Sequence, residues 1–214
     1  MPSDELPVLG FDTSSAFCSA AIVRGGQTVS SRSEHIGRGH AERLFPLIES
    51  ILGESDLDWR DLAAIGTGTG PGNFTGTRIS VAAARGLSMS LGIPAVGVSG
   101  FDALRFGNSE PVLASIDAGR NQVFLQRPDS SEPRIENPDS LDEFYCDDAP
   151  AAVVGHESER IAARLGIRCR APRFPTAVAI ARIAALRMNS AEPPPAPVYI
   201  RRFPATQPGA ARKS

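Results

Sequence analysis

Residues 8–34 have the sequence VLGFDTSSAFCSAAIVRGGQTVSSRSE, and this stretch decides the fold class. It contains two apolar segments and then a more polar one, which is typical of a strand near a sheet edge. The three segments are Val8–Phe11, Ser19–Val23 and Gln27–Glu34. Between the last two, Gly25 and Gly26 stand where a two-residue hairpin turn needs positive φ angles. The stretch therefore predicts an antiparallel meander of three strands.

The residues after the meander change from strand-like to helix-like spacing. Apolar residues recur at helical intervals and stop at Gly53. These residues are Leu44, Leu47, Ile48, Ile51 and Leu52. Pro46 fits only in the first turn of this helix or at a kink, which leaves the helix start open. We then expect a strand at Ala63–Gly68, a helix at Ile79–Leu91 and a strand at Ala95–Val98.

This order of elements predicts a mixed sheet covered by helices. It is the order of the ribonuclease-H-like lobe from which actin-like and sugar-kinase-like (ASKHA) proteins are built by duplication. The second half of the chain begins in a similar way, because Val112–Ile116 ends at Asp117 much as the first strand ends at Asp12. We therefore predict an α/β protein with two lobes, the second one degenerate. The N-terminal ribonuclease-H-like lobe is expected over residues 1–106 and a smaller C-terminal lobe over residues 107–214.

Further elements of the second half are predicted with less regular spacing. The expected strands are Val123–Gln126 and Ala151–Gly155, and the expected helices are Ser158–Leu165 and Thr176–Met188. The chain ends in a basic tail, in which we expect a solvated segment rather than a contact with tRNA or a partner. The basic residues of the tail are Arg201, Arg202, Arg212 and Lys213.

Composition narrows the classes of function. The net charge is −2 and aromatic residues make up 6%, so this chain is not expected to be the main receptor of a nucleic acid. Cys18, Cys146 and Cys169 form neither a disulfide framework nor a CxxC pair. The first seven residues lack the features of a signal peptide, and no apolar run approaches the roughly 20 residues that span a bilayer. We expect a cytoplasmic protein.

The first candidate site follows the first strand, at Asp12, Thr13 and Ser14. In actin-like proteins this position places a carboxylate and hydroxyl groups beside nucleotide phosphates and their metal, since hard cations take oxygen ligands. The alternative is that Thr13 and Ser14 satisfy backbone groups in a turn.

The second candidate is the glycine-rich loop that leads into the second helix. Backbone N–H groups at a helix start attract anions, and an arginine in the first turn adds charge. The candidate phosphate residues here are Gly70, Gly72, Thr75 and Arg78. The loop is neither a Walker A motif nor a GxGxxG motif. The alternative is a tight strand-to-helix connection that uses glycine for close approach.

Read as a whole, the loop resembles a family signature. Gly70-Pro71-Gly72-Asn73-Phe74-Thr75-Gly76-Thr77-Arg78-Ile79 is similar to the Gly-Pro-Gly-Ser-Phe-Thr-Gly-Val-Arg-Ile sequence of the TsaB (YeaZ) family. Other matches to this family occur in order along nearly the whole chain. They are Asp12-Thr13-Ser14, then His40, Leu44, Pro46 and Leu47, then Gly97-Val98-Ser99, Ile116-Asp117-Ala118-Gly119-Arg120 and Pro197-Val198-Tyr199-Ile200-Arg201.

The resemblance implies a two-lobed actin-like fold and a non-catalytic scaffold. Such a subunit pairs with a catalytic paralogue, TsaD, and works with an ATPase, TsaE. Together they transfer threonylcarbamoyl to the adenosine beside the anticodon in tRNAs that read codons starting with A. The resemblance implies no cofactor in the isolated chain, with room for ATP or ADP and Mg²⁺ at the subunit junction. It also implies a homodimer without the partner, and contact with tRNA only through the complex.

The residues agree with a subunit that has no catalytic and no metal-ligating residues of its own. The catalytic paralogue resembles a metal enzyme with a His-x-x-x-His pair on a helix, whereas here Leu44 stands four residues after His40. A metallopeptidase is disfavoured because neither HExxH nor GxSxG occurs. The other function left open is an autonomous ATP-dependent kinase or hydrolase that uses Asp12, Asp117 and the glycine-rich loop.

The two helices of the first lobe suggest how a partner would bind. The second helix is rich in small residues, which allow another helix to approach closely. We hypothesise that both helices supply half of an intersubunit four-helix bundle, although the apolar stripe of the first helix could simply be core. The predicted interface residues are His40, Leu44, Leu47, Ile48, Ile51, Ile79, Ala83 and Leu87.

Overall fold

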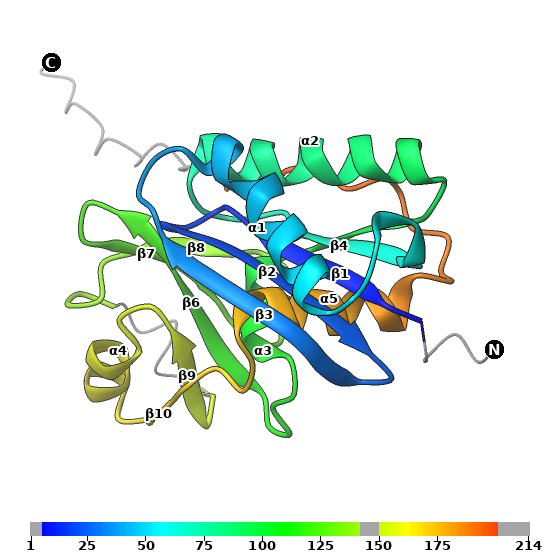
Figure 1. Ribbon diagram of the computed structural model, residues 1–214. Coiled ribbons are helices and arrows are strands. Elements are labelled where there is room, and N and C mark those ends of the chain that lie inside the picture. Colours follow the sequence, from blue (N-terminus) through cyan, green and yellow to red (C-terminus); the bar gives the residue numbers. More distant parts are fainter. Residues whose placement is uncertain (1–5, 142–149, 201–214) are drawn as a thin grey trace, which may run out of the picture.

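The computed structural model describes residues 6–141 and 150–200, which form two five-stranded mixed sheets (Figure 1). The first sheet has the order β3-β2-β1-β4-β5. Its strands are β1 (Val8–Asp12), β2 (Phe17–Arg24), β3 (Gln27–His35), β4 (Ala64–Gly68) and β5 (Ala95–Val98). The central strand β1 pairs antiparallel with β2 and parallel with β4. The predicted meander is confirmed, with β2 beginning two residues earlier than expected.

The second sheet repeats this plan in the order β10-β9-β6-β7-β8. Its strands are β6 (Val112–Gly119), β7 (Gln122–Gln126), β8 (Arg134–Glu136), β9 (Ala152–Gly155) and β10 (Arg168–Arg170). The central strand β6 pairs antiparallel with β7 and parallel with β9, as β1 does with β2 and β4. Both outer strands have only three residues, so the second lobe is the reduced copy. The two-lobed α/β fold is therefore confirmed.

Helices α1 (His40–Glu54) and α2 (Phe74–Leu91) cover one face of the first sheet, and a short 3-10 helix, η2 (Trp59–Asp61), lies between α1 and β4. Pro46 lies inside α1, on its exposed side. Helix α2 begins five residues before the predicted start, because the Asn73 side chain caps it by accepting a hydrogen bond from Gly76 N at 2.9 Å. It ends at Gly92, which has a φ of 69°, as predicted.

Of the three remaining helices in the described residues, α3 (Gly100–Arg105) and α5 (Thr176–Arg187) cross between the halves. Helix α4 (Ser158–Leu165) packs on its own sheet, whereas α3 contacts β6 and β9 of the second sheet. Helix α5 lies in the range predicted for the second lobe but packs on β1, β2 and β4 of the first sheet (Figure 1). The predicted boundary after residue 106 separates the strands of the first sheet from those of the second. The last helix, α5, lies beyond this boundary but packs on the first lobe.

Glycines in the first sheet allow α5 to lie close to it. A Cβ atom on Gly10 would stand 2.5 Å from both the Ala177 carbonyl oxygen and the Ala181 amide nitrogen. A Cβ atom on Gly66 would stand 2.8 Å from the Ala184 Cβ atom. Among the described residues, no helix is long and apolar enough to cross a membrane. The sheets, with α3 and α5 between them, place the ends of β1 and β6 at a common cleft.

Candidate functional site

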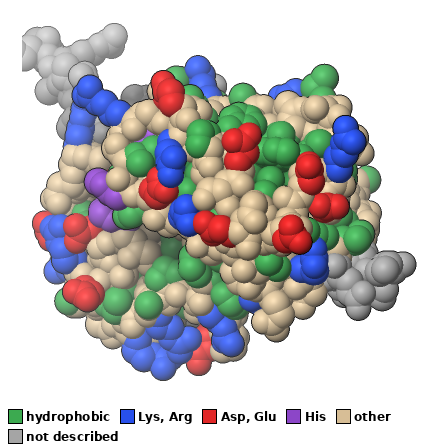
Figure 2. Space-filling view, in the orientation of Figure 1, with side chains coloured by type: hydrophobic (Ala, Val, Ile, Leu, Met, Phe, Trp, Pro, Cys, Tyr) green, Lys and Arg blue, Asp and Glu red, His purple; other side chains and the backbone are tan. Residues whose placement is uncertain are grey.

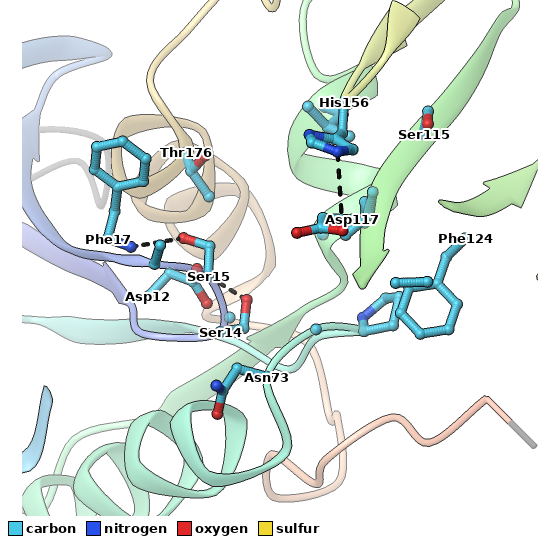
Figure 3. Close-up of a pocket in the computed structure, with 18 of the residues that line it drawn as sticks. Asp12, Ser14, Ser15, Phe17, Asn73, Ser115, Asp117, Phe124, His156 and Thr176 are labelled. Atoms are coloured by element: carbon cyan, nitrogen blue, oxygen red, sulfur yellow. Dashed lines mark hydrogen bonds and ion pairs between the residues drawn. The ribbon is translucent and has the colours of Figure 1, made fainter. Parts of the chain in front are cut away.

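A cleft of about 650 Å³ lies at the junction of the lobes. The first lobe contributes the end of β1 and the glycine-rich loop, and the second contributes the end of β6 and the residue after β9. Figure 3 shows Asp12 and Ser14 on one side of this cleft and Asp117 and His156 on the other. The aspartates of the two half-chain repeats therefore belong to one site.

Asp12 is the buried carboxyl group of the cleft. Its Oδ2 atom accepts a hydrogen bond from Ser14 Oγ at 2.9 Å, while Oδ1 has no hydrogen-bond partner. Burial raises the pKa of Asp12 above its ordinary value, and the hydrogen bond from Ser14 opposes that rise. Gly68 faces Oδ1 so closely that a Cβ atom there would overlap it. The absent side chain at Gly68 gives the carboxyl group its space.

The opposite wall contains residues that were not predicted. Ser115 Oγ is buried without a hydrogen-bond partner, and the exposed His156 lies with Nε2 at 3.8 Å from Asp117 Oδ1. Asp117 Oδ1 also accepts a hydrogen bond from Gly119 N at 2.7 Å. Aligning Ser115-Ile116-Asp117 with Gly10-Phe11-Asp12 would have pointed to Ser115, because it stands two residues before the repeated aspartate. No motif pointed to His156.

Thr13 does not reach the cleft, so the prediction that it contacts phosphate is wrong. Its hydroxyl donates to Gly76 O at 2.7 Å and lies 2.7 Å from Ser80 Oγ, which also accepts from Thr13 N. The side chain is fully buried. Its partners lie in α2, 63 and 67 positions away, and not in a local turn, so Thr13 ties the end of β1 to α2. Ser14 does line the cleft.

The glycine-rich loop is a close-packed connection between β4 and α2, and one side of it lines the cleft. Gly70 has a φ of 83° and precedes a cis peptide bond to Pro71. Gly72 lines the cleft, and a Cβ atom there would overlap the Ser14 carbonyl oxygen. Thr75 and Arg78 are exposed on α2 and do not line the cleft. The predicted phosphate role of Arg78 is wrong for this cleft, because its Nε atom donates to Tyr199 Oη at 2.8 Å.

The residues of the cleft do not fit an ATP–Mg²⁺ site of the kinase type. Among the described residues that line it, His156 is the only side chain that can carry a positive charge, whereas a triphosphate needs several donors or cations. Within residues 6–141 and 150–200, no group of three or more His, Cys, Asp and Glu residues is placed to hold a metal ion. His40 is buried, and its Nε2 atom lies 3.0 Å from Ser15 O.

Comparison with known proteins identifies the family. The family model described as "TsaD: tRNA N6-adenosine threonylcarbamoyltransferase" matches residues 29–179, so the chain carries a TsaD-type domain. The Escherichia coli tRNA threonylcarbamoyladenosine biosynthesis protein TsaB is 36% identical over 122 residues, which are 55% of this chain and 52% of that protein. A solved YeaZ structure from Pseudomonas aeruginosa is 27% identical, with a TM-score of 0.67 over 91% of this chain and 99% of that one. The chain belongs to the TsaB (YeaZ) family.

Coverage differs among the TsaB-family relatives. An uncharacterised Mycobacterium tuberculosis protein is 33% identical over 197 residues, which are 91% of this chain and 92% of that protein. The chain spans about half the length of the curated proteins named TsaB that it matches. The family resemblance read from the signature loop is thus confirmed, and so is the actin-like fold that it implied.

The structure divides the predicted TsaB-type interface residues into two groups. Those on α1 are buried in the chain's own core, between α1, α2 and the first sheet. They are His40, Leu44, Leu47, Ile48 and Ile51. The interface prediction is wrong for these five residues, since their side chains have no surface left for a partner. Ile79, Ala83 and Leu87 on α2 are only partly buried.

Proposed function

We propose that this chain is a non-catalytic subunit of the assembly that makes threonylcarbamoyladenosine in tRNA. In this role it pairs with the catalytic paralogue TsaD and works with the ATPase TsaE. The assembly transfers threonylcarbamoyl to the adenosine next to the anticodon of tRNAs that read codons starting with A. Relatives named tRNA threonylcarbamoyladenosine biosynthesis protein TsaB support this proposal. We further propose that the subunit acts in the cytoplasm.

One observation carries the non-catalytic part of the proposal: three side chains that could serve an enzyme do not face the cleft. Thr13 binds Gly76 and Ser80 inside the fold, and Arg78 lies outside the cleft beside Tyr199. His40, the first position of the paralogue's metal-binding pair, contacts the Ser15 carbonyl oxygen.

The outward face of α2 is the proposed partner surface. It carries small or partly buried residues, and no atom lies within 4 Å of the position of a Cβ on Gly86. The residues of this surface are Ile79, Ala82, Ala83, Gly86, Leu87 and Ser90. Figure 2 shows hydrophobic side chains among charged ones on the face that carries α1 and α2. Such a surface lets a partner helix approach toward the low end of the 8–10 Å range, and a second copy takes this place when TsaD is absent.

The test is a charge at the centre of this surface. Ala83→Asp should weaken the pairing with TsaD by about 2–5 kcal/mol, because a carboxylate would be buried without a partner. Binding is measured by isothermal titration, and threonylcarbamoyladenosine formation is measured with TsaD, TsaE, ATP and tRNA. Ala163→Asp, on the exposed side of α4, is the matched control and should leave both readouts unchanged. A folded Ala83→Asp chain that binds TsaD as tightly as the parent chain would exclude this surface.

An autonomous ATP-dependent kinase or hydrolase is the second candidate, favoured by the unpaired Asp12 Oδ1 and Ser115 Oγ atoms in the cleft. It predicts that the isolated chain binds ATP–Mg²⁺ with roughly micromolar affinity and that Asp12→Asn abolishes turnover. Titration of the pure chain with ATP–Mg²⁺ separates the candidates. The subunit proposal expects no heat from nucleotide but tight binding of TsaD, with any nucleotide held at the subunit junction.

A further inference from the structure

An exposed cluster of two aromatic rings and an arginine lies outside the cleft, on the first turns of α2. It consists of Phe74, Arg78 and Tyr199, and we call it the aromatic–arginine cluster. The last described residues, orange to red in Figure 1, pass behind α2. Val198 N donates to Thr69 O at 2.8 Å, and the buried Pro195 packs over Gly97. These contacts bring Tyr199 beside residues that precede it by more than 120 positions.

The three side chains of the cluster hold one another in place. The Arg78 guanidinium carbon lies 3.8 Å from the centre of the Phe74 ring and 5.7 Å from that of Tyr199. Arg78 Nε donates to Tyr199 Oη at 2.8 Å, and the two ring centres are 5.5 Å apart. The guanidinium is thus oriented by a cation–π contact on one side and a hydrogen bond on the other.

In this orientation the Arg78 guanidinium and the two aromatic rings can still bind a ligand. Among the described residues, no carboxylate forms an ion pair with Arg78, so its two terminal nitrogens can meet an anion bidentately. Phe74 remains 55% exposed and Tyr199 51% exposed, although large aromatic rings are usually covered. A lone carboxylate would use only the guanidinium. A nucleotide in a single strand would use the guanidinium for its phosphate and the rings for its base.

We propose that the aromatic–arginine cluster binds a single-stranded segment of RNA, with Arg78 at a phosphate and the half-exposed rings stacked on bases. This inference rests on the proposed function in tRNA modification, and it goes further by giving the subunit a direct contact with RNA.

The test uses the full chain and a fluorescein-labelled 12-nucleotide single-stranded RNA, with binding followed by anisotropy at about 50 mM salt. Phe74→Ala and Arg78→Ala should each weaken binding roughly tenfold or more, the effect of losing one stacked base or one charge-assisted contact. Arg85→Ala is the matched control, because Arg85 is exposed on the same helix and has no described aromatic neighbour. It should change affinity by less than about twofold. The basic tail is retained in every variant, so it does not account for differences between them.

Two further arms separate RNA from other ligands. A duplex RNA of equal length should bind at least about tenfold more weakly, since its paired bases cannot stack on the rings. In the second arm, an acidic peptide competes with the RNA. If it displaces the RNA and its own affinity is unchanged by Phe74→Ala, the inference is overturned in favour of a protein carboxylate as the ligand. Unchanged RNA binding by both Phe74→Ala and Arg78→Ala would also overturn it.

The readouts also distinguish this inference from the proposed function. If the parent chain supports threonylcarbamoyladenosine formation while the cluster variants bind RNA like the parent, only the inference fails. If RNA binding depends on the cluster but the chain does not support formation with TsaD and TsaE, only the proposed function fails. Thermal unfolding of each variant confirms that these exposed substitutions leave the fold intact.

Discussion

At the scale of single residues, the surroundings of Asp12 disfavour the charged form of its carboxyl group. It is buried, one of its oxygens has no hydrogen-bond partner, and burial raises its pKa above the ordinary value of 3.8. The folded chain therefore holds this proton more tightly than the unfolded chain does. The stability that the group contributes is complete below the unfolded pKa and is lost as the pH rises through the folded pKa.

Asp12→Asn is thus expected to stabilise the chain at pH 7. The neutral amide removes a buried charge but still leaves one polar atom without a partner, so we expect a net gain of about 1 kcal/mol. The gain should shrink as the pH falls through the raised pKa of Asp12, because the parent carboxyl group is then protonated too. Urea unfolding at pH 7 and near pH 4 measures both values. Asp117→Asn is the control, since that exposed carboxylate should change stability by less than about 0.5 kcal/mol. A parent chain more stable than Asp12→Asn at pH 7 would contradict this account of Asp12.

At the scale of elements, the docking of α5 on the first sheet depends on glycine at position 10. An alanine Cβ there would stand 2.5 Å from backbone atoms of Ala177 and Ala181, which cannot turn aside as a flexible side chain can. We expect Gly10→Ala to destabilise the chain by roughly 1–3 kcal/mol or more, because α5 must shift away from β1. Gly53→Ala in α1 is the matched control. No atom lies within 4 Å of its Cβ position, so it should stabilise by roughly 0.5–1 kcal/mol. Equal midpoints in urea for the two variants would show that α5 is not held in this way.

The sequence predicted most helices and strands because the spacing of their apolar residues is visible locally. It missed an element that is too short to show a period and contacts between residues that are far apart in the sequence. Helix α3, Gly100–Arg105, has six residues, too few for a helical period to be visible. The alanine-rich α5 is buried on most sides, so no polar face revealed which sheet it covers. In the candidate site, Asp12 and Ser14 were found because they end a predicted strand. Arg78 was misplaced because Tyr199, its partner, is 121 positions away.

At the scale of the whole molecule, the crossing of α3 and α5 predicts that the two lobes unfold together. Each helix follows the last strand of one sheet and packs on the other sheet, so neither lobe keeps its core when the other opens. The single tryptophan, Trp59, lies in the first lobe and reports on that lobe by fluorescence. Leu113 is fully buried in the core of the second lobe, on β6.

Leu113→Ala should therefore lower the unfolding midpoint that Trp59 reports, although the two residues belong to different lobes. The cavity should destabilise the chain by roughly 2–5 kcal/mol, and each kcal/mol lowers Tm by about 2–4 °C for a chain of this size. Far-UV circular dichroism, which sees both lobes, should give the same midpoint as the Trp59 signal. An unchanged Trp59 midpoint, with a lower midpoint by circular dichroism, would mean that the lobes unfold independently. Because the proposed partner surface on α2 belongs to the first lobe and half of the cleft to the second, coupled lobes would also let binding at one reach the other.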